Sequence, residues 1–396
     1  MSTEPLLRVS SERALRALFV NENVAGHATM HLGIRHAMRD HPEIDPTFLD
    51  VPRPGLLRRI VRLPVPGLAR LDLDLQPLRS ELAKSTWVRR QVRDRRERIE
   101  VLHVYTQNAA LLIAEELRRH PSVLSTDGTG MLCASLLPYR EPTRFTPTRA
   151  RLGRLLERRA FDAATLVVAQ SSWAAQSLRD DYGIDDDRLR VIPFGVVVPD
   201  AVATHASGDG TEGTRREITL PELTLPEITW VGGTMRRKGG SLLLQLYRDR
   251  LRDRCRLNLV TRERVPEEPG VRVFNDIHPN DGQLTALLAR SAVLAFPSSM
   301  DTFGYVALEA MAVGVPVVGF ALNALPELVD DGVTGLLTEP DGEALVAAML
   351  RLIDDPALRV GMGHAARARV LERYDARVTT ARLIEVLKEA RSVHAG

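Results

Sequence analysis

The sequence is poor in cysteine. It has only two in 396 residues, Cys133 and Cys255, and they are too few and too far apart for a disulfide framework. No cluster of histidines and cysteines has the spacing of a zinc site either. We therefore expect a protein with neither structural disulfides nor a metal centre.

Lysine is equally scarce. Lys84, Lys238 and Lys388 are the only lysines among 53 basic residues. The excess of arginine is typical of a GC-rich coding genome and carries no functional signal of its own. Because 51 acidic residues leave a net charge of +2, the composition does not indicate a nucleic-acid-binding protein.

Long apolar runs are missing as well. Residues 1–11 lack the apolar core of a signal peptide. The longest uncharged run, residues 310–326, is interrupted by glycine and proline and is short for a membrane span. We therefore expect a soluble, cytoplasmic protein and leave open a position at the inner face of the membrane. The length favours two domains.

What the chain does contain is two successive series of strands and helices, typical of α/β domains with parallel sheets. We expect two Rossmann-like, doubly wound domains that face each other across a cleft. The first spans residues 1–198 and the second 227–375, with a linker at 199–226, and the last helix, 376–396, is expected to pack back on the first domain. The predicted strands are 16–20, 99–105, 122–126, 165–169 and 189–192, then 227–231, 256–260, 271–274, 292–296 and 315–320.

Two places in the first half are candidate ligand contacts. The first strand enters a loop with Gly26 and His27 before a helix from about Met30, a layout that directs backbone N–H groups toward an anion. His27 is either a ligand-binding side chain or an ordinary loop residue. Asp127 follows the strand 122–126, at the sheet edge where ligands bind, and its alternative is an Asx-turn.

The second half opens with a basic, glycine-rich loop. Residues 232–240 read Gly-Gly-Thr-Met-Arg-Arg-Lys-Gly-Gly and follow a predicted strand. Glycines around three consecutive cations, at the start of a helix, are suited to hold a phosphate. A solvated basic turn is the alternative, but it gives the glycines no purpose.

Glu309 is the only carboxylate between Thr302 and Pro326. It falls in the middle of an apolar helix between two predicted strands. Burying a glutamate without a partner is costly, so Glu309 either holds a ligand or lies on an exposed helix face.

Residues 51–100 are unusually basic. Thirteen basic and six acidic residues give a local charge of +7, and apolar residues are interleaved with the arginines. Such a stretch can contact an anionic membrane or an acidic acceptor. The alternative is a solvated helix face in an arginine-rich protein.

Taken together, these motifs resemble the retaining, nucleotide-sugar-dependent glycosyltransferases of family 4, whose GT-B architecture has two facing Rossmann-like domains. The resemblance is strongest from Trp230 to Tyr374 and looser in the first domain. The residues that carry it are Arg237-Lys238-Gly239, Pro297-Ser298, Phe303-Gly304, Glu309 to Ala312, Gly314 to Val318, Pro326-Glu327, Asp331-Gly332 and Gly335, and in the first domain Gly26-His27, Ser171 to Trp173 and Pro193 to Gly195.

The resemblance implies a donor site. Asp301 and Glu309 keep the spacing of the family's acidic pair, with aspartate in place of the usual first glutamate. Asp301 would bind the sugar hydroxyls, Glu309 the ribose, and the helix start at Phe303 and Gly304 the phosphate. Gly233 stands where the family commonly has an arginine, so Arg236 or Arg237 would supply the second cation beside Lys238.

The predicted function is transfer of a hexose-type sugar from a nucleotide-diphosphate sugar, with retention, to a glycan, lipid or small molecule. Neither a cofactor nor a metal is implied. A non-catalytic nucleotide-sugar-binding subunit and a nucleotide-sugar epimerase remain alternatives. The expected catalytic residues are Asp301, Arg237 and Lys238. The expected donor-binding residues are Gly233, Phe303, Gly304 and Glu309, and those on the acceptor or sugar side are Gly26, His27 and Asp127.

Overall fold

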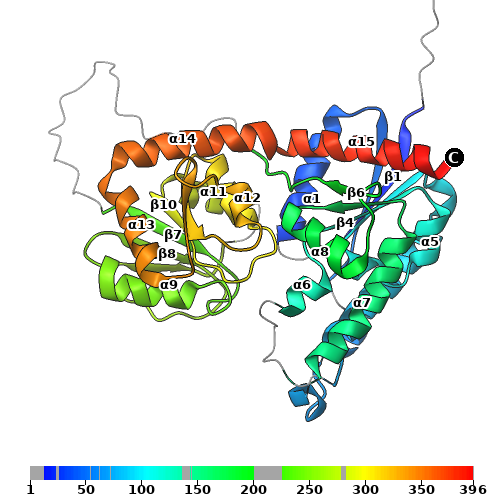
Figure 1. Ribbon diagram of the computed structural model, residues 1–396, viewed down its shortest axis with the longest axis horizontal. Helices are drawn as coiled ribbons and strands as arrows, with labels where there is room; N and C mark the ends of the chain where they lie inside the picture. The colour runs from blue at the N-terminus through cyan, green and yellow to red at the C-terminus, as the bar shows by residue number, and fades with distance from the viewer. Residues whose placement is uncertain are drawn as a thin grey trace, which may run out of the picture.

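The chain forms two α/β units, each built on a six-stranded, fully parallel sheet (Figure 1). The computed structural model describes residues 13–23, 26–53, 55–61, 63–71, 73–135, 143, 145–199, 225–277 and 282–395. The predicted fold class, two Rossmann-like domains, is confirmed.

The first sheet has the strand order β2-β1-β3-β4-β5-β6. The order reverses between β1 and β3, and in such sheets ligands bind outside the carboxyl ends of the strands at that switch point. The strands are β1 (Leu15–Asn21), β2 (Ile44–Asp50), β3 (Val101–Tyr105), β4 (Ser122–Thr126), β5 (Leu166–Ala169) and β6 (Leu189–Val191).

The second sheet has the order β12-β11-β10-β7-β8-β9, with its switch point between β7 and β10. The strands are β7 (Glu227–Val231), β8 (Arg256–Val260), β9 (Val271–Phe274), β10 (Val293–Phe296), β11 (Val317–Phe320) and β12 (Gly335–Thr338). The strands predicted at 227–231, 256–260 and 271–274 have the bounds found in the structure.

Helices connect the strands and cover both faces of each sheet. In the first unit they are α1 (Gly26–Ala37), η1 (Met38–Asp40), α2 (Leu56–Val61), η2 (Leu68–Leu71), α3 (Gln76–Arg93), η3 (Arg96–Arg98), α4 (Gln107–Ala110), α5 (Ala114–Arg119), α6 (Gly130–Ser135), α7 (Thr146–Ala163) and α8 (Ser172–Tyr182). After β7 they are α9 (Gly240–Leu246), η4 (Tyr247–Leu251), α10 (Gln283–Ala289), α11 (Tyr305–Ala312), α12 (Leu325–Leu328), α13 (Gly342–Asp354), α14 (Pro356–Arg373) and α15 (Ala376–Ala395).

Successive side chains of β1 point to opposite faces of the first sheet, and each face carries a hydrophobic core. Leu18 and Val20 pack with α3, α7 and α8 on one face. Ala17 and Phe19 pack on the other face against α15, which contributes Leu383, Ile384, Val386, Leu387 and Ala390. The last helix therefore completes the core of the first unit, and Figure 1 shows α14 and α15 running in sequence across both units.

The two chain crossings between the units touch each other. The Val196 N–H donates to the Tyr374 carbonyl at 2.8 Å, and the Ala376 N–H donates to the Val196 carbonyl at 3.0 Å. The chain thus leaves the first unit and returns to it at the same place, which ties both connections into one short ladder.

Some predicted bounds were wrong. Helix α1 begins at Gly26, not near Met30, so Gly26 and His27 belong to its first turn. Two short helices, α4 and α5, connect β3 to β4. Strand β2 was not predicted. None of the described helices is long and apolar enough to cross a membrane.

Candidate functional site

A cleft of about 1270 Å³ lies between the two units, at the carboxyl ends of both sheets. Walls from both units line it, at the switch points β1/β3 and β7/β10. The ten site residues predicted from the sequence all lie on its lining: Gly26, His27, Asp127, Gly233, Arg237, Lys238, Asp301, Phe303, Gly304 and Glu309.

The basic loop brings its cations to the cleft through a tight turn at Gly239. This glycine precedes α9 with φ +74°, and a Cβ there would lie 2.0 Å from the Pro297 carbonyl oxygen. A residue with a side chain cannot take this place without a shift of the backbone. Arg237 and Lys238 line the cleft, whereas Arg236 is exposed outside the lining.

Asp301 holds two positive groups at once. Its carboxylate forms an ion pair with the Lys238 ammonium and accepts a hydrogen bond from the Gly304 N–H at 3.2 Å. Gly304 precedes α11 with φ +95°, so this N–H belongs to the positive end of a helix dipole. An acidic group therefore already occupies the place where a lysine and a helix start meet.

Glu309 lies on the second turn of α11, half-buried at the cleft. Burial raises the pKa of its carboxyl to about 7. Among the described residues, no group forms a hydrogen bond or an ion pair with this carboxylate. No described partner therefore offsets the cost of burying this carboxylate, which is the situation expected of a ligand-binding acid.

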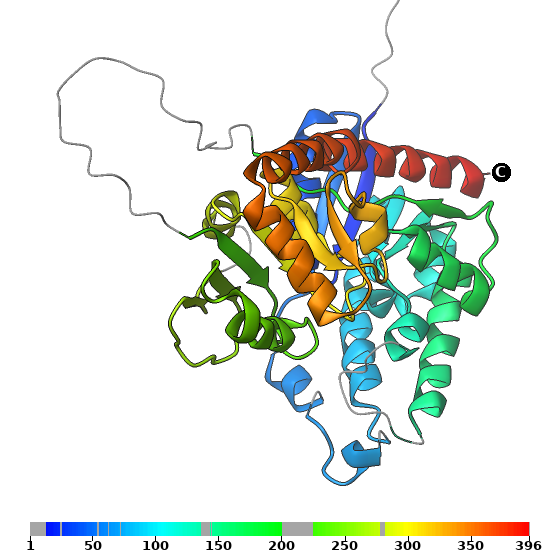
Figure 2. The same ribbon diagram turned by 60° about the vertical axis from the view of Figure 1, so that its left-hand side comes forward.

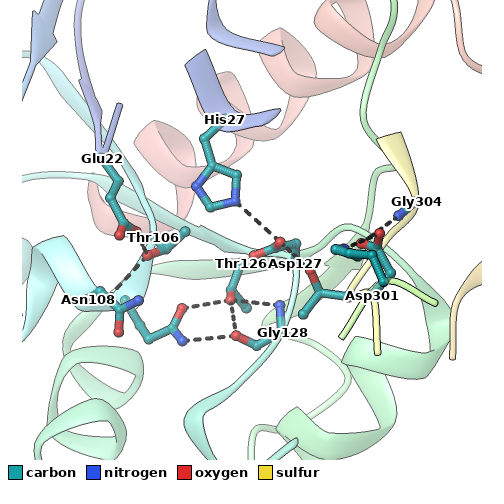
Figure 3. A network of polar contacts seen from close by, with 12 residues as sticks. Glu22, His27, Thr106, Asn108, Thr126, Asp127, Gly128, Asp301 and Gly304 are labelled. Carbon is teal, nitrogen blue, oxygen red and sulfur yellow. Dashed lines mark hydrogen bonds and ion pairs between the residues drawn. The ribbon is translucent and has the colours of Figure 1, made fainter. Parts of the chain in front are cut away.

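Opposite this helix, His27 and Asp127 form a pair (Figure 3). The His27 Nε2 lies 3.3 Å from Asp127 Oδ2, and the Thr302 hydroxyl of the second unit donates to the same oxygen at 2.6 Å. Burial acts to lower the pKa of His27, but the carboxylates of Asp127 and Glu22 outweigh it and raise that pKa. Burial likewise acts to raise the pKa of Asp127, but His27 and Thr302 outweigh it and lower that pKa.

A second buried cluster beside this pair was not predicted. Lys84 of α3 lies 2.5 Å from the Glu22 carboxylate and also pairs with Glu81. The Thr106 hydroxyl donates to Glu22, as Figure 3 shows. The signal that could have identified Glu22 is its place directly after β1, at the switch point of the sheet. Nothing local marks Lys84, which is 62 residues away in sequence.

Phe303 contributes to packing between the units. Its side chain is buried, and its ring contacts that of Phe194 with centroids 4.7 Å apart, edge to face. Phe194 also contacts Tyr105 and Tyr305. This aromatic cluster joins the first unit to the start of α11 and forms part of the cleft wall.

Glu327 connects the units away from the cleft. Its carboxylate accepts the backbone N–H groups of Ser172 at 2.7 Å and Trp173 at 2.9 Å, at the start of α8. The Tyr305 hydroxyl adds a bond to the Gly195 carbonyl at 3.0 Å. Both contacts involve residues of the motifs that carried the resemblance.

Two family models match the chain. Residues 13–195 match the "Glycosyl transferase 4-like domain", and residues 226–355 match "Glycosyl transferases group 1". The first match spans strands β1 to β6 and the second spans strands β7 to β12.

Curated relatives match part of the chain. The D-inositol 3-phosphate glycosyltransferase of Corynebacterium glutamicum is 30% identical over 247 residues, which are 58% of this chain and 58% of the relative. The MMP alpha-(1->4)-mannosyltransferase of Mycolicibacterium hassiacum is 29% identical over 232 residues, 56% of this chain and 53% of the relative. The alignments thus span between half and two thirds of these relatives.

Solved structures match nearly the whole fold. Sucrose-phosphate synthase of Thermosynechococcus elongatus has a TM-score of 0.69 at 19% identity, covering 96% of this chain and 100% of that one. The Anabaena protein HepE in complex with UDP and glucose has a TM-score of 0.61 at 18% identity, covering 95% and 100%. The chain belongs to the group 1, family 4-like glycosyltransferases of the GT-B fold.

Proposed function

We propose that the protein transfers a hexose-type sugar from a nucleotide-diphosphate sugar to an acceptor held in the first-unit half of the cleft, with retention of anomeric configuration. The acceptor hydroxyl attacks from the face that the diphosphate leaves, and its proton passes to the departing phosphate oxygen. This scheme needs no side-chain nucleophile and no metal.

The diphosphate site carries the proposal. Lys238 and Arg237 line the cleft beside the start of α11, so two cations and a helix dipole point to one place. Groups held in such positions stabilise the negative charge that grows on a leaving diphosphate, and removing one donor of this kind typically costs about 100- to 1000-fold in rate. The Asp301 carboxylate contacts two of these groups, Lys238 and the Gly304 N–H at the helix start.

The nucleoside extends from the diphosphate along α11. Glu309 lies five residues after Gly304, on the same helix and on the same cleft lining. An ionised carboxylate that accepts two ribose hydroxyl groups would relieve the cost of burial that raises its pKa. We assign Glu309 to the ribose for this reason.

The sugar then lies between Asp301 and the first unit. We assign Asp301 to the sugar hydroxyls once the diphosphate replaces it at Lys238. The His27–Asp127 pair lies across the cleft, and its charged form offers a donor and an acceptor to sugar or acceptor hydroxyls. Gly26 lies at the contact between α1 and the second unit, where a Cβ would make an ordinary contact with the Tyr305 side chain at 3.6 Å.

UDP-glucose is the first donor to test, because a neighbour of the same fold is known in complex with it. D-inositol 3-phosphate, named for the curated relatives, is a first acceptor. Sugar release and transfer are measured with the wild-type protein in EDTA, with GDP sugars as further donors.

Lys238→Ala should lower the rate of donor turnover about 100-fold or more. Arg236→Ala is the matched control, since this neighbouring cation lies outside the cleft lining, and it should keep the wild-type rate. Equal rates for wild type and Lys238→Ala would contradict the assignment. Donor binding without turnover for any donor would instead favour a binding subunit, and release of an epimer would favour an isomerase.

A further inference from the structure

One end of the first unit carries an exposed surface that is both apolar and basic. We define this tip as the described residues of 53–73 together with 146–155, the first part of α7. In Figures 1 and 2, the short helices α2 and η2 and the beginning of α7 all lie at the lower end of the first unit. The Thr143 hydroxyl donates to the Leu71 carbonyl at 2.9 Å, which fixes the two segments together.

The tip gathers exposed apolar side chains. Nine of the eighteen exposed large hydrophobic side chains among the described residues lie here. On soluble monomers, exposed hydrophobic side chains are usually scattered singly. Their clustering in the tip therefore indicates a contact surface. The nine are Leu56, Ile60, Leu63, Val65, Leu68, Leu71, Leu73, Leu152 and Leu155.

The charge of the tip has one sign. The charged side chains described in the tip are all arginines: Arg53, Arg59, Arg70, Arg149, Arg151 and Arg154. A second copy of the chain seated on this surface would bring arginines against arginines, which is unfavourable. An anionic phospholipid surface supplies the complementary charge and accepts leucine side chains at the same time.

The second part of the basic stretch, from the start of α3 at Gln76 to residue 100, does not belong to this surface. On α3, Val88 and Val92 are buried in the core, while Arg89 and Arg93 form ion pairs with Glu115 and Glu116 of α5. The charges of Arg89 and Arg93 are therefore neutralised within the protein. Arg58 and Arg62, part of the sequence pattern, have side chains outside the described residues.

We propose that the tip docks the protein on an anionic phospholipid bilayer, with the leucines in the interfacial layer and the arginines at the lipid phosphates. The same segments reach the cleft, since Arg53, Ala150 and Gly153 line it. Docking would therefore bring the acceptor half of the cleft to the lipid surface and favour an acceptor that resides there. Only this last step rests on the proposed function.

Vesicle co-sedimentation tests the docking without any turnover. Wild-type protein should sediment with vesicles of phosphatidylcholine plus phosphatidylglycerol and remain free with phosphatidylcholine alone. Arg70→Glu combined with Arg151→Glu should weaken binding about tenfold or more, since each basic residue contributes to attraction by an anionic surface. Both arginines are exposed and lie outside the cleft lining.

Arg96→Glu combined with Arg98→Glu is the matched charge control. It makes the same charge change within residues 51–100, but beyond the far end of α3, a helix of 18 residues that is about 27 Å long. This control should bind as the wild type does. If this control lost as much vesicle binding as the tip variant, the effect would come from net charge alone, and the proposal would be overturned.

The apolar part is tested with Leu56→Ser combined with Leu63→Ser, against Leu371→Ser combined with Val393→Ser, which are exposed elsewhere. Only the tip pair should weaken vesicle binding. These residues lie outside the core clusters, so circular dichroism should be unchanged. Absence of wild-type binding to the anionic vesicles, or self-association in solution that the tip variants abolish, would refute bilayer docking.

Discussion

Asp301 competes with the diphosphate for the groups that would bind it. Its carboxylate pairs with Lys238 and accepts a hydrogen bond from the Gly304 N–H. These are two of the groups assigned to the diphosphate. An incoming diphosphate therefore has to displace an internal anion, and part of its attraction to Lys238 is spent on breaking this ion pair.

Asp301→Asn removes the internal anion but keeps the size of the side chain. We expect UDP to bind about tenfold more tightly, because Lys238 no longer has a competing carboxylate, while sugar transfer falls. Calorimetric titration with UDP measures the first effect. Asp301→Glu, which restores the acid and adds one methylene, is the control and should not tighten binding. Weaker UDP binding by the asparagine variant would show that Asp301 positions Lys238 for the ligand.

Glu309 gives the donor site a pH dependence. Its pKa is raised to about 7, so the carboxyl is largely protonated below that pH in the free protein, whereas two ribose hydroxyls need the ionised form. Donor affinity should therefore weaken as the pH falls below about 7, by at most about tenfold per pH unit. Calorimetric titrations of UDP at a series of pH values measure this slope.

Glu309→Gln serves as the control for that slope, since it removes the titrating group and keeps an acceptor oxygen. It should bind UDP more weakly at high pH and show a flatter dependence. An unchanged slope in this variant would assign the titration to another group, such as Glu157, whose pKa burial also raises to about 7.

At this scale, residues in local motifs could be predicted and residues that act through tertiary contacts could not. Lys238 was named because a glycine-rich turn is visible in sequence, and Asp301 because, with Glu309, it keeps the spacing of the family's acidic pair. Their ion pair, the buried Glu22–Lys84 pair and the bond from Thr302 to Asp127 link residues at least 62 positions apart. No periodicity encodes such distances.

The turn that opens α9 is the element on which the cations depend. Gly239 takes φ +74° against the Pro297 carbonyl, directly after Lys238. A side chain here meets both a conformational penalty and a steric clash. The turn therefore couples the basic loop to the loop after β10, which leads to Asp301.

Gly239→Ala should lower the free energy of unfolding by about 2 kcal/mol or more, the left-handed penalty plus the clash, and should weaken UDP binding. Urea denaturation and calorimetric titration measure the two effects. Gly233→Ala is the matched control in the same loop, because its Cβ would meet nothing within 4 Å. Equal stability of the two variants would mean that the loop relaxes at no cost.

Elements with strong apolar patterns could be predicted, and irregular ones could not. Strand β2 contains Pro46 and polar residues and lies at the sheet edge, where proline is tolerated and one side needs no ladder bonds. Such an edge strand has no clear alternation. The start of α1 at Gly26 was not predicted, because neither Gly26 nor His27 provides a helix-capping signal.

At the scale of the whole molecule, side-chain contacts hold the cleft in its present width. Glu327 accepts two N–H groups at the start of α8, a place where the helix dipole favours a negative charge. The two-unit architecture could be predicted from the alternating strands and helices. The contacts that hold the two units together could not be predicted, because they are single contacts between residues far apart in sequence.

Glu327→Ala should shift the molecule toward an open cleft, since hydrogen bonds to a charged, partly exposed group stabilise by about 1–2 kcal/mol. Small-angle scattering should report a larger radius of gyration, and UDP should bind about as before because the donor site lies within the second unit. Glu372→Ala, which removes an exposed acid of α14, is the control. Identical scattering curves for the two variants would rule out a closing role for Glu327.

Helix α15 has a consequence for how the protein is made. It completes the core of the first unit although it follows the second unit in sequence. A ribosome that has synthesised all of the first sheet has still not supplied the helix for one of its faces, and a domain that emerges incomplete stays exposed to misfolding. Folding of the first unit must therefore wait for the second, so the unit made first is finished last.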